Sequence, residues 1–190
     1  MSTTELWRRR RMLYVFGFEK LCVAISDLYF LDPAPDPGQG EGPERGVRLE
    51  IRLLELGSST GSIYAARPIN LGRALWRGDL LESIGGPYGS FDRTHHHLAF
   101  KNWEPGHRMY DEALSANPLG FLTKALLDPQ TLLVHAEYEP NDIGEHDFEN
   151  LRASVPEIMD VIDRTLQRIF AGELAVAPAG EVTQARIGWL

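Results

Sequence analysis

Cysteine is almost absent from this chain of 190 residues, because Cys22 is its only one. A single cysteine cannot form a disulfide within the chain, and it excludes a zinc site built from several cysteines. Cys22 lies in a largely apolar run, so we expect a buried, unreactive thiol and not a nucleophile.

Long apolar runs and an excess of basic charge are also missing. No stretch of about 18 or more apolar residues occurs, which argues against a membrane-spanning helix, and residues near the start lack the pattern of a signal peptide. The formal net charge of −8 argues against non-specific nucleic-acid binding. We therefore expect a cytoplasmic protein with no membrane or nucleic-acid partner, folded as a single domain over residues 1–190.

Familiar catalytic motifs are absent as well. No GxxxxGK[ST] loop for phosphate occurs, and the glycines at 85–89 do not have that spacing. No G-x-S-x-G nucleophile elbow is present. The acidic segment 137–149 lacks the ligand spacing of a calcium loop, so we interpret it as a solvated face. The motifs alone identify no reaction.

Strand-like segments fill most of the first hundred residues. Segment 47–56 alternates between apolar and charged residues, which predicts a strand with one solvated face. Short turns join the segments, and the alternation of strands and helices that is typical of a parallel sheet is missing. We therefore predict an antiparallel, curved sheet of about six to seven strands. The other expected strands are 12–17, 21–31, 62–69, 73–82, 92–100 and 131–139.

Helix signals appear only in the second half of the chain. Asn117 followed by Pro118 predicts the start of a short helix, and an apolar stripe from Ser154 to Gly172 predicts a long C-terminal amphipathic helix. The fold class is therefore α+β. Proline and glycine in 32–46 predict a mobile loop, and 173–190 is expected to be a loose tail.

The stretch 73–111 concentrates the residues that can do chemistry, including four of the six histidines. Side chains alternate along a strand, so His95 and His97 share one face while His96 points the other way. Residues two apart on a strand lie about 6.6 Å apart along its axis, which allows two imidazoles to converge on one ion.

Asp79 is expected beside these two histidines, because 73–82 and 92–100 should pair as a hairpin. Imidazole nitrogens and carboxylate oxygens are ligands for zinc, so His95, His97 and Asp79 are a candidate site for a divalent metal such as Zn²⁺. Further candidate ligands are Glu104, His107 and His135.

A candidate pocket surrounds this site. Trp103 and Tyr110 are expected to wall it, with Glu104 and His107 in the same turn and with Arg77 beside Asp79 on the strand. Three interpretations remain open: a hydrogen-bonded structural layer without metal, a metal site, and a metal-free site for acid–base chemistry or ligand binding.

Three motifs carry a resemblance to a family. They are W-R-x-D-L at 76–80, the histidine cluster at 95–97 and W-E-P-G at 103–106. Together they make the chain similar, over roughly residues 60–128, to a family of small uncharacterised actinobacterial proteins. The resemblance implies a bacterial protein and transfers no catalytic role, because that family has no established activity.

Two functional hypotheses follow. The first is a small-molecule enzyme or binding protein with a His/Asp site on the sheet, dependent on a metal or not. The second is a non-catalytic accessory or protein-interaction protein with structural histidines. Neither hypothesis specifies a substrate, and a homo-oligomer remains open under both.

Overall fold

The computed structural model describes residues 12–31, 42–177 and 186–188. The largest part of the predicted loop at 32–46 and parts of the predicted tail lie outside these residues. Within them, no helix has the length and apolar character that a membrane crossing requires.

The sheet is an antiparallel meander, as predicted. Its strands follow the order β1-β2-β3-β4-β5, and a further strand, β8, pairs with β2. A separate two-stranded ribbon is formed by β6 and β7. The strands are β1 (Leu13–Gly17), β2 (Leu21–Phe30), β3 (Glu44–Leu56), β4 (Ile69–Ser83), β5 (His95–His97), β6 (Phe100–Lys101), β7 (Glu104–Pro105) and β8 (Arg186–Gly188).

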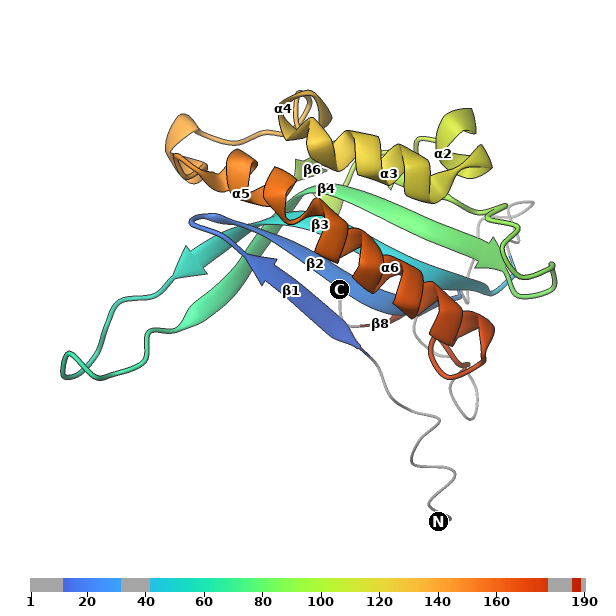
Figure 1. The fold of residues 1–190 in the computed structure, drawn as a ribbon, viewed down its shortest axis with the longest axis horizontal. Coiled ribbons are helices and arrows are strands. Elements are labelled where there is room, and N and C mark those ends of the chain that lie inside the picture. The colour runs from blue at the N-terminus through green and yellow to red at the C-terminus, as the bar shows by residue number, and fades with distance from the viewer. Residues whose placement is uncertain (1–11, 32–41, 178–185, 189–190) are drawn as a thin grey trace, which may run out of the picture.

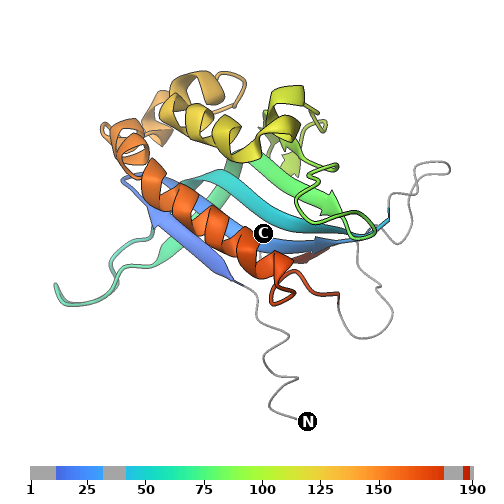
Figure 2. The ribbon, with the colours of Figure 1, turned by 45° about the vertical axis from the view of Figure 1, so that its right-hand side comes forward.

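Most of the helices lie in the second half of the chain and cover one face of this sheet (Figures 1 and 2). The predicted start of α3 is confirmed, because the Asn117 side chain accepts the Gly120 N–H at 3.0 Å. The helices are α2 (Glu112–Ala116), α3 (Pro118–Leu127), α4 (Pro129–Leu132), the 3₁₀ turn η1 (Pro140–Asp142), α5 (Asp147–Ala153) and α6 (Val155–Phe170). The α+β class is therefore confirmed, with more short helices than the sequence indicated.

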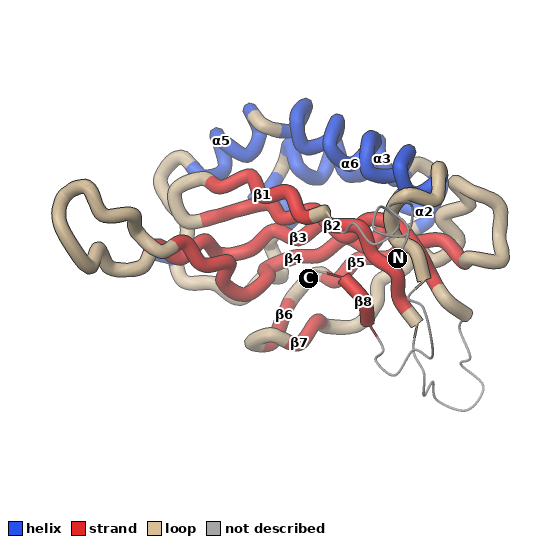
Figure 3. Tube along the Cα trace, turned by 90° about the horizontal axis from the view of Figure 1, so that it is seen from below, coloured by secondary structure: helices blue, strands red, loops and turns tan. Residues whose placement is uncertain are grey.

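The core lies between α6 and the sheet. Helix α6 turns one stripe, including Ile158, Ile162 and Leu166, onto the buried side chains of β2 and β3. These apolar residues recur every three or four positions, which places them on one side of a helix. Seen from below, the helices line one side of the sheet, whereas β6, β7 and β8 lie on the other (Figure 3).

Two predicted strands are wrong. Segment 62–69 forms the turn at the end of the β3–β4 hairpin, and only Ile69 belongs to a strand. Segment 131–139 begins inside α4 and continues without a strand. Asp128 explains the second error, since its side chain accepts the Thr131 N–H at 3.3 Å and starts a new helical turn at Pro129.

The loop and the tail also differ from expectation. Strand β3 begins at Glu44, so Glu44–Gly46 belong to the sheet. In the tail, Leu174 and Ala175 are buried, and the Ala175 N–H donates to Asp27 Oδ2 at 3.0 Å. Residues 186–188 form β8, so the tail is partly built into the fold.

Candidate functional site

The pairing of β4 with β5 brings the candidate ligands together. Asp79 lies opposite His95, and Arg77 lies opposite His97. His96 points to the helix side, where its ring lies 6.1 Å from that of Trp76 and 5.7 Å from that of Phe121, centroid to centroid. The predicted division of the three histidines between the two faces is thus confirmed.

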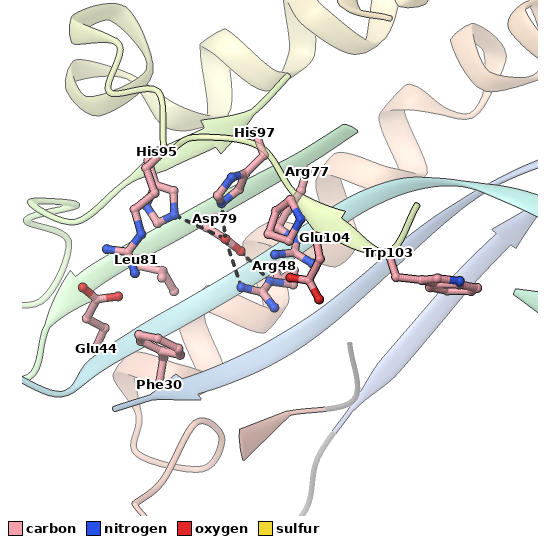
Figure 4. Close-up of a pocket in the computed structure, with 12 residues that line it drawn as sticks. Phe30, Glu44, Arg48, Arg77, Asp79, Leu81, His95, His97, Trp103 and Glu104 are labelled. Carbon is pink, nitrogen blue, oxygen red and sulfur yellow. Dashed lines mark hydrogen bonds and ion pairs between the residues drawn. The ribbon is translucent and has the colours of Figure 1, made fainter. Parts of the chain in front are cut away.

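Asp79, His95 and His97 form a compact buried cluster on the face away from the helices (Figure 4). Asp79 Oδ2 lies 3.5 Å from His95 Nε2 and 3.8 Å from His97 Nε2. One ligand atom from each residue lies within 4.8 Å of the other two. The three residues expose only 1%, 2% and 5% of their surface, so bulk water does not separate them.

Backbone carbonyls determine which nitrogen of each imidazole carries hydrogen. His95 Nδ1 lies 2.8 Å from the Arg93 carbonyl oxygen, and His97 Nδ1 lies 2.7 Å from that of Gly106. A carbonyl can only accept, so each Nδ1–H must donate. The neutral rings therefore turn their Nε2 lone pairs towards Asp79.

The electrostatics keep these histidines neutral and the aspartate charged. Burial lowers the pKa of His95, and it lowers that of His97 to about 4. Burial alone would raise the pKa of Asp79, but the charge and hydrogen bonds of Arg48 outweigh it and hold this pKa well below its usual range. Near neutral pH, two lone pairs and a carboxylate thus face one another.

Arg48 fixes the position of the Asp79 carboxylate from the neighbouring strand β3. Its Nε donates to Oδ1 at 2.6 Å and its Nη2 donates to Oδ2 at 3.0 Å. This two-point pairing holds the carboxylate in one plane. Oδ2 retains a further lone-pair direction, on the side where the histidines lie.

A second charged cluster lies beside the first. Glu50 is fully buried and accepts hydrogen bonds from both Arg77 and Arg52. The solvated face predicted for β3 is therefore wrong for Arg48 and Glu50, because these residues pair with Asp79 and Arg77 across the β3–β4 register. Pairing removes much of the cost of burying their charges.

A pocket of about 350 Å³ opens above the Asp79/His95/His97 cluster. Six of its lining residues match the candidate pocket: Arg77, Asp79, His95, His97, Trp103 and Glu104. Six others were missed: Phe30, Glu44, Arg48, Leu81, Pro105 and Arg108. The sequence did contain a signal that could have predicted Arg48 in this lining, since the charges of β3 alternate in register with those of β4. It contained no such signal for Phe30 or Arg108.

Three predicted residues stand apart from this pocket lining. Tyr110 is exposed and does not line the pocket, although its ring lies 5.6 Å from that of His95. His107 and His135 are also exposed, and neither joins the cluster of candidate ligands within the described part of the chain. Glu104 lines the pocket without belonging to that cluster.

Cys22 is unrelated to this site. It is fully buried, as predicted, and burial raises the pKa of its thiol to about 11. A thiol that stays protonated is a poor nucleophile.

Comparison with models of known protein families, with curated proteins and with solved structures gave no match for this chain. The similarity to the actinobacterial family therefore stays a prediction, and the site has to be interpreted from its own geometry.

Proposed function

We propose that this protein binds a divalent metal ion such as Zn²⁺ through Asp79, His95 and His97, and that it presents the ion to a small molecule in the pocket above. The observation that carries this proposal is the convergence of three unprotonated acceptor atoms in a buried space. Acceptors that face one another repel, and a cation between them removes the repulsion.

The distances suit such an ion after a small adjustment. Two ligand atoms that each lie about 2.1 Å from a tetrahedral zinc ion are about 3.4 Å apart. The distances from Asp79 Oδ2 to the two Nε2 atoms are 3.5 and 3.8 Å. The surrounding bonds also suit a metal site, because metal-bound histidines commonly donate their second N–H to a carbonyl, and ligating carboxylates are themselves hydrogen-bonded.

Three protein ligands leave a coordination position open, which is the arrangement of catalytic and ligand-binding zinc sites. The pocket leads to that position, and an ion there could polarise a bound carbonyl or lower the pKa of bound water. The function best supported is therefore that of a metal-dependent small-molecule enzyme or binding protein.

A second candidate function is favoured by the complete pairing of Arg48 with Asp79. In that case the histidines form a structural layer that joins β4 and β5 to the turn at Gly106, and the protein is a non-catalytic accessory or interaction protein. The two candidates differ in whether the cluster takes up metal.

Zinc titration separates them. Protein stripped with a chelator is titrated with Zn²⁺ by calorimetry, and the zinc retained after desalting is measured by elemental analysis. We expect about one zinc per chain in the native protein, and none retained in His95→Ala or His97→Ala. His96→Ala is the matched control, since its ring faces the helices, and it should retain zinc.

The structural alternative gives a different pattern. No zinc would be retained by the native protein, and His95→Ala and His97→Ala would each lower stability by roughly 1–3 kcal/mol through the carbonyls left unpaired. Zinc uptake that survives both substitutions would place the metal elsewhere and overturn the proposal.

A further inference from the structure

The charge of the pocket lining depends on the metal. Three arginines and three acidic residues line it, so their formal charges balance: Arg48, Arg77, Arg108, Glu44, Asp79 and Glu104. A divalent ion on the cluster therefore leaves this lining with a net positive charge. A concave site of one sign concentrates ligands of the opposite sign, so the metal-loaded pocket favours an anion.

Arg77 is the lining residue best placed to receive that anion. Its Nε–H donates to Glu50 Oε1 at 2.6 Å, and its Cζ lies 4.9 Å from the centroid of the Phe100 ring. These two contacts fix the plane of the guanidinium. No acceptor for its Nη groups is found among the residues that the structure describes, so one edge of the group remains for a ligand.

The pairing around Arg77 is short of negative charge. Glu50 serves two guanidinium groups, those of Arg77 and Arg52. An oxyanion beside Arg77 would supply the missing charge through a planar, two-point pairing.

The remaining walls define the rest of the ligand. The lining also includes four apolar residues, Phe30, Leu81, Pro105 and Trp103, which suit a ligand with a carbon skeleton. Its volume of about 350 Å³ is near the lower limit for ligand pockets, so the ligand is small. Glu44 and Glu104 also line it, and they would repel a phosphate dianion more strongly than a single carboxylate.

We propose that the ligand is a small carboxylic acid whose carboxylate lies between the metal ion and Arg77. Its carbon skeleton packs against Phe30 and Leu81, which lie together on one side of Asp79, whereas Trp103 lies on the other side (Figure 4). This inference rests on the proposed metal site, since without the ion the lining carries no excess positive charge.

The test uses the full chain, first titrated with Zn²⁺ alone and then, when loaded, titrated by calorimetry with matched probes. Benzoate is compared with benzamide, and 3-phenylpropanoate with 3-phenylpropanamide, because each amide preserves shape and removes the charge. Inorganic phosphate is the third probe. We expect each carboxylate to bind at least about tenfold more tightly than its amide, since a hydrogen bond to a charged group commonly contributes that much.

A pair of substitutions locates the contact. Arg77→Lys preserves the charge beside Glu50 but loses the planar fork, so carboxylate affinity should fall about tenfold while zinc content stays at one per chain. Arg52→Lys is the matched control, because Arg52 bonds the same Glu50 but does not line the pocket. It should leave both zinc content and carboxylate affinity unchanged.

The outcomes are distinguishable. If zinc binds but carboxylates bind no better than their amides, or phosphate binds more tightly than either carboxylate, the carboxylate proposal is overturned and the metal site stands. If Arg52→Lys weakens the carboxylate as much as Arg77→Lys, the contact has been misplaced and the proposal is overturned as well. If no zinc binds, the proposed function and this inference fail together.

Discussion

His97 donates its Nδ1–H to the carbonyl oxygen of Gly106, 2.7 Å away, and this bond ties β5 to the turn that carries the pocket wall. Trp103, Glu104 and Pro105 precede that glycine directly, and all three line the pocket. The same imidazole turns Nε2 towards Asp79. One side chain thus links the position of the pocket wall to the candidate metal site.

The first prediction concerns the buried pair of Arg48 and Asp79. Arg48→Met should lower the free energy of unfolding by about 3–5 kcal/mol, because it leaves a carboxylate buried without its main partner. Arg48→Met combined with Asp79→Leu should recover much of that loss. Urea denaturation of the metal-free proteins measures both effects.

An exposed ion pair serves as the control for that experiment. Arg164 pairs with Asp160 at the surface of α6, so Arg164→Met should cost less than about 1 kcal/mol. Equal losses for Arg48→Met and Arg164→Met would show that Asp79 does not depend on Arg48.

The second prediction concerns pH. Burial lowers the pKa of all three histidines of β5, and that of His97 falls from 6.5 to about 4. Between these two values the unfolded chain binds protons that the folded protein does not, so stability falls as the pH falls. The melting temperature of the metal-free protein should therefore decrease steadily from pH 7 to pH 5.

Two variants test whether that pH dependence comes from the buried histidines of β5. His97→Asn should make it less steep, because one of the three histidines that titrate differently in the folded and unfolded states is gone. His107→Asn should preserve it, because His107 is exposed. A melting temperature that is constant between pH 7 and pH 5 would contradict the buried, neutral state of these histidines.

The third prediction concerns α6. Ile162→Ala and Leu166→Ala should each lower the free energy of unfolding by roughly 2–5 kcal/mol, because both side chains are buried against the sheet. Gln167→Ala, on the exposed side of the same helix, should cost almost nothing. Similar small losses at all three positions in chemical denaturation would mean that α6 is peripheral.

Period-two and helical patterns were sufficient to predict much of this fold. The alternation at 47–53 identified β3, and the stripe beyond Ser154 identified α6. The same reasoning put His95 and His97 on one face and beside Asp79, because strands that follow one another in a meander usually pair. The type of an element and the face on which a side chain lies depend on the spacing of neighbouring residues, so the sequence alone is enough to predict them.

The remaining features depend on contacts between distant segments. The charged face of β3 was expected to be solvated, because alternation indicates two faces but not which elements cover each one. Phe30 and Arg108 reach the pocket from β2 and from the segment after β7, and no local pattern predicts that meeting. The segment 131–139 was misread since its apolar run suits a strand, whereas the cap at Asp128 favours a helical turn.

The central claim is that Asp79, His95 and His97 hold one metal ion, and anomalous diffraction at the zinc absorption edge tests it most directly. Crystals grown with Zn²⁺ should show one strong anomalous peak between the three side chains, about 2.0–2.2 Å from His95 Nε2, His97 Nε2 and Asp79 Oδ2. Data collected just below the edge should lack that peak. A map with ordinary water density between the three side chains, and no anomalous signal there at saturating zinc, would contradict the account.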